Sequence, residues 1–261
     1  MLFCNNTNKW TWDASIVSDN KFSSTAIELV IEKINSLDND AQDVLKHASC
    51  LGHSFSLGTI KCLVKHDKCI EDAICTGVIT QQKMNNSIYK FAHDQIQQAA
   101  FFSITKKNDK KIFWSIGQKL LISFPIQELD DNIFVVARLL FHSVSLASDE
   151  NGRLEIASLL MQAGKKAMPS NALEQSHECF CNGKHLLGRE CWKNHYDLTL
   201  ELHNLTAKSA FCVSDYATMN VIIEEISQNV ASKLHKIQSC SLQIKQCIGK
   251  RRFEKAISSG I

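Results

Sequence analysis

The feature that most limits the fold of this chain is its scarcity of residues that interrupt helices. The 261 residues include only 2 prolines and 10 glycines, and long uninterrupted stretches favour helices over a turn-rich all-β fold. From Asp94 onward, the spacing of apolar residues predicts helix after helix. These helices span approximately residues 94–104, 108–121, 130–147, 150–166, 170–187, 194–213, 215–230, 233–248 and 250–258.

The predicted helices are joined by short turns, at breaks such as Pro125, Pro169 and Gly188. Short turns make consecutive helices antiparallel neighbours. A clean repeat of about 34 residues is absent, so the likeness to tetratricopeptide (TPR) arrays is one of architecture only. We expect an α-solenoid of antiparallel helix pairs whose last pair is incomplete, because the array lacks the polar cap with which solenoids close.

The region before Asp94 combines helical and extended patterns. Apolar spacing predicts three helices, which begin near Thr25, Asp38 and Ser56. Two short strands follow at 77–80 and 87–92, with a polar turn between them. Three helices followed by a small β-hairpin is the order of a winged helix. The expected fold class is therefore mainly all-α, with a winged-helix domain ahead of the solenoid.

Charge and cysteine content narrow the class of protein. Lys and Arg number 29 and Asp and Glu 27, so a net charge of +2 does not predict a nucleic-acid or membrane surface as a general partner. The 11 cysteines include no C-x-x-C pair. The sequence shows neither a secretory signal nor an apolar run of about 18 residues. We expect reduced, half-buried cysteines in a cytoplasmic protein.

Several motifs together resemble the winged-helix and helical-repeat portion of STAND-type (AAA-related) signalling ATPases. The resemblance covers nearly the whole chain, and its most specific motif is FAHDQIQQAAF. The motifs occur in the order WTWD (10–13), AQDVLKHASCLGHSF (41–55), FAHDQIQQAAF (91–101), LLMQAGKKAMPSNAL (159–173) and NHYDLTLELHNLTAKSAF (194–211). In that family this portion follows a P-loop domain and belongs to multi-sensor hybrid histidine kinases or multidomain Ser/Thr kinases.

The resemblance implies a nucleotide contact at His93 and Asp94. An equivalent His-Asp pair in related ATPases touches bound ADP from across a domain interface. By this resemblance His93 would donate to the β-phosphate, and Asp94 would cap the next helix and hold His93 in orientation. The chain has no G-x-x-x-x-G-K-[ST] phosphate cradle and no kinase motif. We therefore expect no enzyme activity and no cofactor in this chain, with ADP or ATP bound by the parent protein.

Other interpretations of these residues stay open. His93 and Asp94 would have a purely structural role if no nucleotide domain meets them, and the three glutamines after them would solvate a helix face or contact a neighbouring domain. The winged helix would read DNA if its third helix, with Lys61, Lys65, His66 and Lys68, entered a groove. The basic run 106–111 would be a solvated helix start or a docking patch for an acidic surface.

The remaining candidate chemistry is weaker. Potential zinc ligands cluster in the second half of the chain without a recognised zinc spacing. They are His177, Cys179, Cys181, His185, Cys191 and His195. We favour the interpretation that a helical array buries these residues for structural reasons, so no metal is expected. Ser, Cys, His and Asp residues are abundant but form no nucleophile motif such as G-x-S-x-G.

The sequence thus predicts a non-catalytic regulatory module that couples the nucleotide state of a P-loop domain to sensor and kinase domains. Its expected partners are protein domains, without a membrane. Residues 1–19 would end a missing nucleotide-binding domain, 20–105 would form the winged helix, and 106–261 the helical repeats. The alternative is a winged-helix transcriptional regulator that binds DNA.

Overall fold

The computed structural model describes residues 3–5, 9–11, 32, 34–63, 68–82, 85–105, 109–147, 149–230 and 232–252. The chain divides into two units, residues 1–112 and 113–261, and the division falls within helix α7 (Asp109–Ser123). The three-part division expected from the sequence stays a prediction.

Unit 1 begins with a two-stranded antiparallel pair, β1 (Phe3–Asn5) and β2 (Lys9–Thr11), in which Cys4 lies opposite Trp10. The helix predicted to begin near Thr25 lies mostly outside the described residues.

Helix α3 (Asn39–Leu51) begins where the sequence predicts, directly after Asp38. The Asp38 carboxylate accepts a hydrogen bond from the Ala41 amide at 2.6 Å, which satisfies a first-turn N–H group. At the other end Gly52 has φ +124°, a backbone conformation that side chains disfavour. Val44, Leu45 and Ala48 are almost fully buried, so this helix contributes one apolar face to the core of unit 1.

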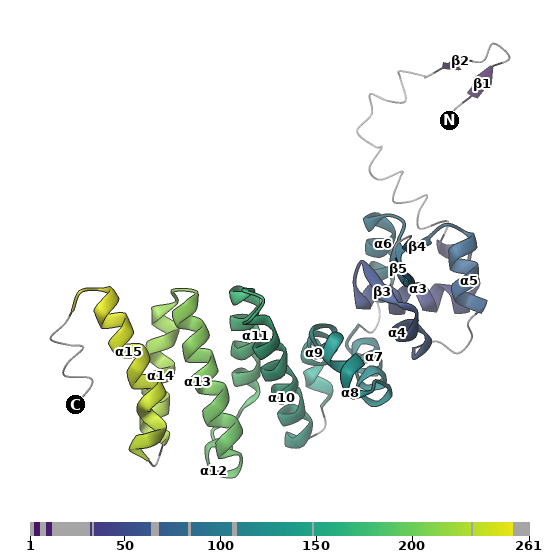
Figure 1. Cartoon of the computed structure of the whole chain (residues 1–261). Helices are drawn as coiled ribbons and strands as arrows, with labels where there is room; N and C mark the ends of the chain where they lie inside the picture. Colours follow the sequence, from purple (N-terminus) through teal and green to yellow (C-terminus); the bar gives the residue numbers. More distant parts are fainter. Residues whose placement is uncertain are drawn as a thin grey trace. The chain divides into compact units, whose positions relative to one another are not determined.

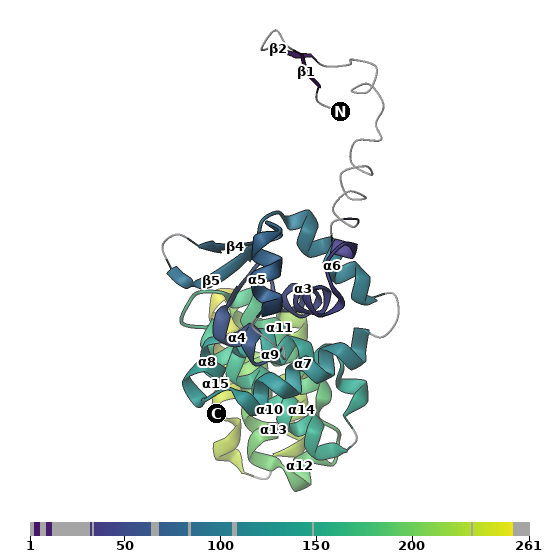
Figure 2. The same cartoon turned by 90° about the vertical axis from the view of Figure 1, so that its right-hand side faces the viewer.

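A three-stranded antiparallel sheet follows, built from β3 (Ser54–Ser56), β4 (Ile79–Gln82) and β5 (Asn85–Phe91) in the order β3-β5-β4. The predicted hairpin is confirmed as β4 and β5, which Figure 2 shows beside the helices of unit 1. Strand β3 was missed. Its Phe55 is buried and meets Phe91 edge-on, with ring centroids 5.9 Å apart. Three residues show too little alternation to predict a strand, and only the sheet makes this one recognisable.

The third predicted helix is wrong in extent. Ser56 caps a helix as expected, with its hydroxyl accepting from the Thr59 amide at 2.9 Å, but α4 (Leu57–Lys61) is short. A separate helix, α5 (Lys68–Cys75), precedes the hairpin, and α6 (Asp94–Thr105) follows it. From Asn39 to Thr105, unit 1 therefore has the order helix, strand, two helices, hairpin, helix.

Unit 2 is helical throughout its described residues. After α7 come α8 (Ile126–Asp131), α9 (Ile133–His142), η1 (Val144–Leu146), α10 (Glu150–Ala167), α11 (Leu173–Leu186), α12 (Cys191–Asn194), α13 (Tyr196–Cys212), α14 (Tyr216–Asn229), η2 (Lys233–Lys236) and α15 (Ile237–Gly249). Figure 1 shows the long helices from α10 to α15 standing side by side as a row. The prediction of a mainly α-helical chain with a small sheet and antiparallel helix pairs is confirmed.

Two predicted helices of unit 2 are interrupted. The helix expected over 130–147 is divided among α8, α9 and η1. The Asn132 side chain donates to the Glu128 carbonyl at 2.9 Å, and such local bonds compete with the helical backbone. The helix expected from 233 begins as the 3₁₀ turn η2. The last predicted helix, over 250–258, lies outside the described residues from residue 253 onward.

Close approach of small residues joins α10 to α11. Phe180 is fully buried against Gly164, where an added Cβ would lie 2.5 Å from the ring carbon Cε1. The Ser176 hydroxyl donates to the Gly164 carbonyl at 2.8 Å. Only glycine at position 164 leaves space for the Phe180 ring, so this contact sets the spacing of the two helices.

Candidate functional site

The His93–Asp94 pair lies at the junction between β5 and α6. His93 is exposed, and its carbonyl accepts the first hydrogen bonds of α6, from the Ile96 amide at 3.0 Å and the Gln97 amide at 3.4 Å. His93 therefore immediately precedes the helix, beside the first-turn N–H groups that an α-helix leaves without internal partners.

The backbone just before His93 is held on both sides. The Phe91 amide donates to the His53 carbonyl at 3.2 Å, and the Ala92 amide donates to the Val78 carbonyl at 3.0 Å. The Phe91 side chain is almost fully buried. The junction thus passes from the core of the sheet to an exposed His93 within two residues.

Asp94 has a different neighbour from the one the resemblance implies. Its carboxylate lies 2.9 Å from Nδ1 of His53, at the start of β3. It is the first residue of α6 and not its cap, and no hydrogen bond to His93 is found among the described residues. Since both side chains of the His53–Asp94 pair are more than half exposed, the pair contributes little to stability. It does fix the orientation of the Asp94 carboxylate.

The three glutamines that follow have no shared site. Gln97 donates from Nε2 to the Ser49 carbonyl at 3.5 Å, which links α6 to α3. Gln98 is exposed and Gln95 is half-buried.

Most candidate DNA contacts fall where the structure gives little detail. Lys61 is exposed at the end of α4. Lys65 and His66 lie outside the described residues, as do 106–108 of the basic run. Lys110 and Lys111 of that run are exposed on α7. Lys68 is the first residue of α5.

The predicted metal-type cluster does not converge. Within the described part of the chain, no group of three or more His, Cys, Asp or Glu side chains is placed to hold a metal ion. Cys181 Sγ lies 3.5 Å from His177 Nε2, whereas Cys191 Sγ points to Glu150 Oε1 at 3.7 Å. His185 is exposed. His195 accepts a hydrogen bond from the Thr199 hydroxyl through its backbone carbonyl, not through its imidazole.

Ser209 and His177 lie at hydrogen-bond distance, like a nucleophile and its base, but the hydrogen bond between them runs in the wrong direction. The Ser209 hydroxyl donates to the Thr206 carbonyl at 3.0 Å, so it accepts from His177 Nδ1 at 2.9 Å. Ser209 is also almost fully buried. An activated nucleophile needs its own proton directed at the base, and this pair lacks that arrangement.

The nearby thiols are not reactive either. Burial raises the pKa of Cys179 to about 11, with a further contribution from the charge of Glu178. Burial also raises the pKa of Cys181, with the Asp215 charge adding to it. Thiols with raised pKa values stay protonated and are poor nucleophiles and metal ligands.

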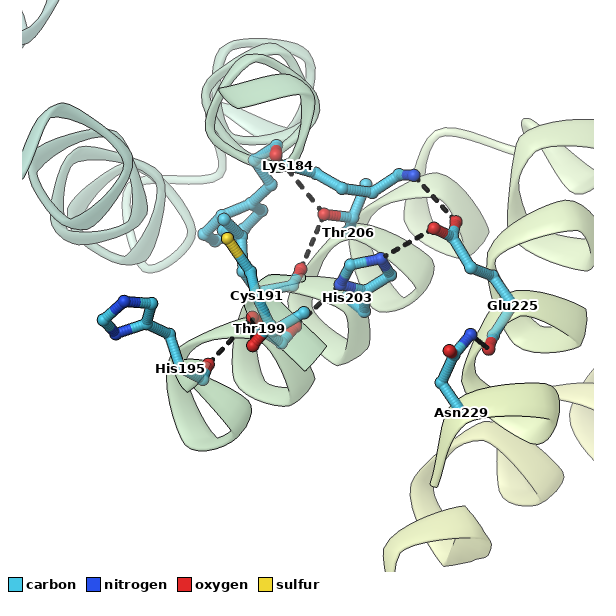
Figure 3. A network of polar contacts seen from close by, with 10 residues as sticks. Lys184, Cys191, His195, Thr199, His203, Thr206, Glu225 and Asn229 are labelled. Carbon is cyan, nitrogen blue, oxygen red and sulfur yellow. Dashed lines mark hydrogen bonds and ion pairs between the residues drawn. The ribbon is translucent and has the colours of Figure 1, made fainter. Parts of the chain in front are cut away.

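A partly buried polar network joins α11, α13 and α14 (Figure 3). The Glu225 carboxylate accepts from Lys184 Nζ at 2.8 Å through one oxygen, and its other oxygen lies 3.3 Å from His203 Nε2. His203 Nδ1 faces the Thr199 carbonyl at 2.7 Å and must donate to it, because a carbonyl only accepts. The Trp192 ring covers the imidazole, with centroids 4.7 Å apart. Sequence spacing offered no signal for these long-range contacts.

We expect this network to make unit 2 sensitive to acid. Burial lowers the pKa of His203, although its contacts with Thr199 and Glu225 oppose that effect. The unfolded chain therefore takes up this proton first, so stability should fall as the pH drops from about 6.5 towards the lower folded pKa. His203→Gln should flatten the dependence of unfolding free energy on pH in this window by up to about 1.4 kcal/mol per pH unit.

Hydrogen exchange of the α11 and α13 amides at several pH values would measure this slope. The matched control is His185→Gln, which replaces an exposed imidazole on α11. Equal slopes in the two variants would contradict the assignment to His203.

Comparison with known proteins gives an informative similarity. Over an alignment of 328 residues that includes the whole chain, the sequence is 26% identical to hybrid signal transduction histidine kinase G of Dictyostelium discoideum. The chain resembles a signalling protein. The chain spans 10% of the length of that relative.

The other comparisons set the limits of this finding. No protein-family model matches the chain. No solved structure matches it. Among the helices that the structure describes, none has the length and apolar character to cross a bilayer.

Proposed function

We propose that this chain is the regulatory and docking portion of a cytoplasmic STAND-type signalling ATPase. Unit 1 responds to the nucleotide state of a P-loop domain, and the helices of unit 2 relay that state to sensor and kinase domains. The observation that carries this proposal is the similarity over the whole chain to a hybrid signal transduction histidine kinase.

Unit 1 supports its part of the proposal by the order of its elements. A helix, a strand, two helices and a hairpin, with sheet order β3-β5-β4, is the arrangement of a winged helix. In that arrangement α5 takes the place of the DNA-reading helix. Its sequence KCIEDAIC has one cation and two carboxylates, which disfavours a phosphate backbone as the partner. A protein surface is the better partner for this unit.

His93 is suited to sense ADP held by a neighbouring domain. It is exposed at the start of α6, where unpaired N–H groups and the helix dipole favour an anion such as a phosphate. When bound in the adjoining P-loop domain, ADP would supply that anion. The contact with His53 keeps the Asp94 carboxylate on the β3 side of the junction. A contact present only with ADP would bias the arrangement of the domains.

Isothermal titration with ADP tests this proposal. The chain alone should give no binding heat, because it lacks a phosphate cradle. A fusion that places a STAND P-loop domain before residue 1 should bind ADP. In the fusion, His93→Ala should weaken ADP binding about tenfold, the effect of one lost charge-assisted hydrogen bond.

The control in the same fusion is His142→Ala, which removes an exposed imidazole from α9 and should leave ADP affinity unchanged. Micromolar ADP binding to the chain alone would refute the proposal. Equal ADP affinity of the His93→Ala and unchanged fusions would refute the role of His93.

A further inference from the structure

The end of unit 2 carries an unbalanced positive charge. Residues 232–252 contain no Asp or Glu, and their cations are Lys233, Lys236, Lys245, Lys250, Arg251 and Arg252. All of them except the half-buried Lys236 are exposed. In the described part of unit 2, none of these side chains forms an ion pair with a carboxylate, whereas Lys165, Lys166 and Lys184 all do. The positive charge is therefore available to a partner.

Three of these cations, Lys236, Lys250 and Arg252, line a groove between α14 and α15, which we call the α14–α15 groove. Its volume is about 480 Å³. Its lining includes the buried residues Ile223 and Cys247 and the amide side chains of Asn220, Gln243 and Gln246. A lining that combines apolar side chains with amide donors and acceptors suits a polypeptide segment.

Cations lie at both ends of this groove. Lys236 precedes α15, and its Nζ donates to the Ser227 carbonyl at 2.8 Å. Lys250 follows α15, with its Nζ 4.8 Å from the centre of the Tyr216 ring, and Arg252 lines the same end. Fourteen residues separate the two lysines, about 20 Å along a helix. Glu224 supplies the only carboxylate among the lining residues.

We infer that the α14–α15 groove docks an acidic helical segment of a partner protein. A helix of about four turns matches the length of the groove, its apolar residues would cover Ile223, and its carboxylates would meet Lys250 and Arg252. Single-stranded nucleic acid is the less suitable occupant, because its bases need exposed aromatic faces to stack upon, and Tyr216 already lies beneath Lys250. This docking does not depend on nucleotide sensing at His93.

Fluorescence anisotropy with the full chain tests the inference. The probe is a labelled helical peptide of about 16 residues with Leu on one face and Glu on the other. We expect micromolar binding that weakens as salt screens the charges. Lys250→Gln combined with Arg252→Gln should weaken binding about tenfold, whereas Glu224→Gln should tighten it by removing the carboxylate from the groove.

The matched control is Lys119→Gln combined with Lys208→Gln, which removes two exposed cations from α7 and α13 and should leave the affinity unchanged. A peptide with Gln in place of each Glu should bind at least about tenfold more weakly. The inference is overturned if the acidic peptide does not bind, or if both lysine-containing variant pairs reduce binding equally. Tighter binding of a short DNA duplex or of phosphatidylserine vesicles would also overturn it.

Discussion

Replacing Phe180 with alanine should lower the free energy of unfolding of unit 2 by about 3–5 kcal/mol. Phe180 is fully buried at the contact of α10 with α11 and packs in one cluster with Ala157, Met161 and Leu202. Its removal loses the transfer free energy of the ring and leaves a cavity that the rigid helices fill only in part. Hydrogen exchange of the α10 and α13 amides should report the loss.

The matched control is Phe134→Ala on α9, because Phe134 is only half-buried. Its effect should be clearly smaller. Equal losses in the two variants would show that the Phe180 cluster is not the centre of the unit 2 core.

Gly164→Ala should destabilise unit 2 by about 1–3 kcal/mol, against the usual effect of this substitution. Alanine is the better helix former by about 1 kcal/mol, so an open position would gain stability. At Gly164, however, the new Cβ would lie 2.5 Å from Phe180 Cε1, and the helices would have to separate. Urea unfolding followed by circular dichroism would measure the change.

Gly188→Ala serves as the control, because nothing lies within 4 Å of the Cβ that it would add. It should be close to neutral. Combining Gly164→Ala with Phe180→Leu should cost less than the sum of the two single changes, because the smaller side chain relieves the clash. Strict additivity would contradict this account of the α10–α11 contact.

Local signals account for most of the helix boundaries that were predicted correctly. Asp149 caps α10 by accepting from the Gly152 amide at 2.9 Å, and Asp215 caps α14 by accepting from the Thr218 amide at 3.1 Å. Each is a short-range bond between residues three apart, so the residue types in sequence suffice to indicate it. The β4–β5 hairpin was recognisable for the same reason.

Boundaries that depend on distant residues were not predictable. Strand β3 exists because Phe55 and Tyr89 occupy paired positions in the sheet, 34 residues apart in the sequence. The separate helix α5 and the interruption at Asn132 were also missed, because apolar periodicity continues across both places.

In the candidate site, too, short-range features were predictable and long-range contacts were not. His93 was found through a local motif, and the hairpin and helix on either side of it were predicted. The contact between Asp94 and His53 was not, because those residues are 41 positions apart and meet only when β5 pairs with β3.

The amino-acid sequence by itself determined the helical character of the chain, the β-hairpin and most helix ends, because these depend on interactions between residues a few positions apart. Only the tertiary structure decided which side chains form hydrogen bonds, contact the same carboxylate or pack against each other. Glu225 lies beside both Lys184 and His203, and Gly164 lies beneath Phe180, because separate helices bring them together. Such contacts leave no periodic trace in the sequence, since each is set by the spacing and rotation of whole helices.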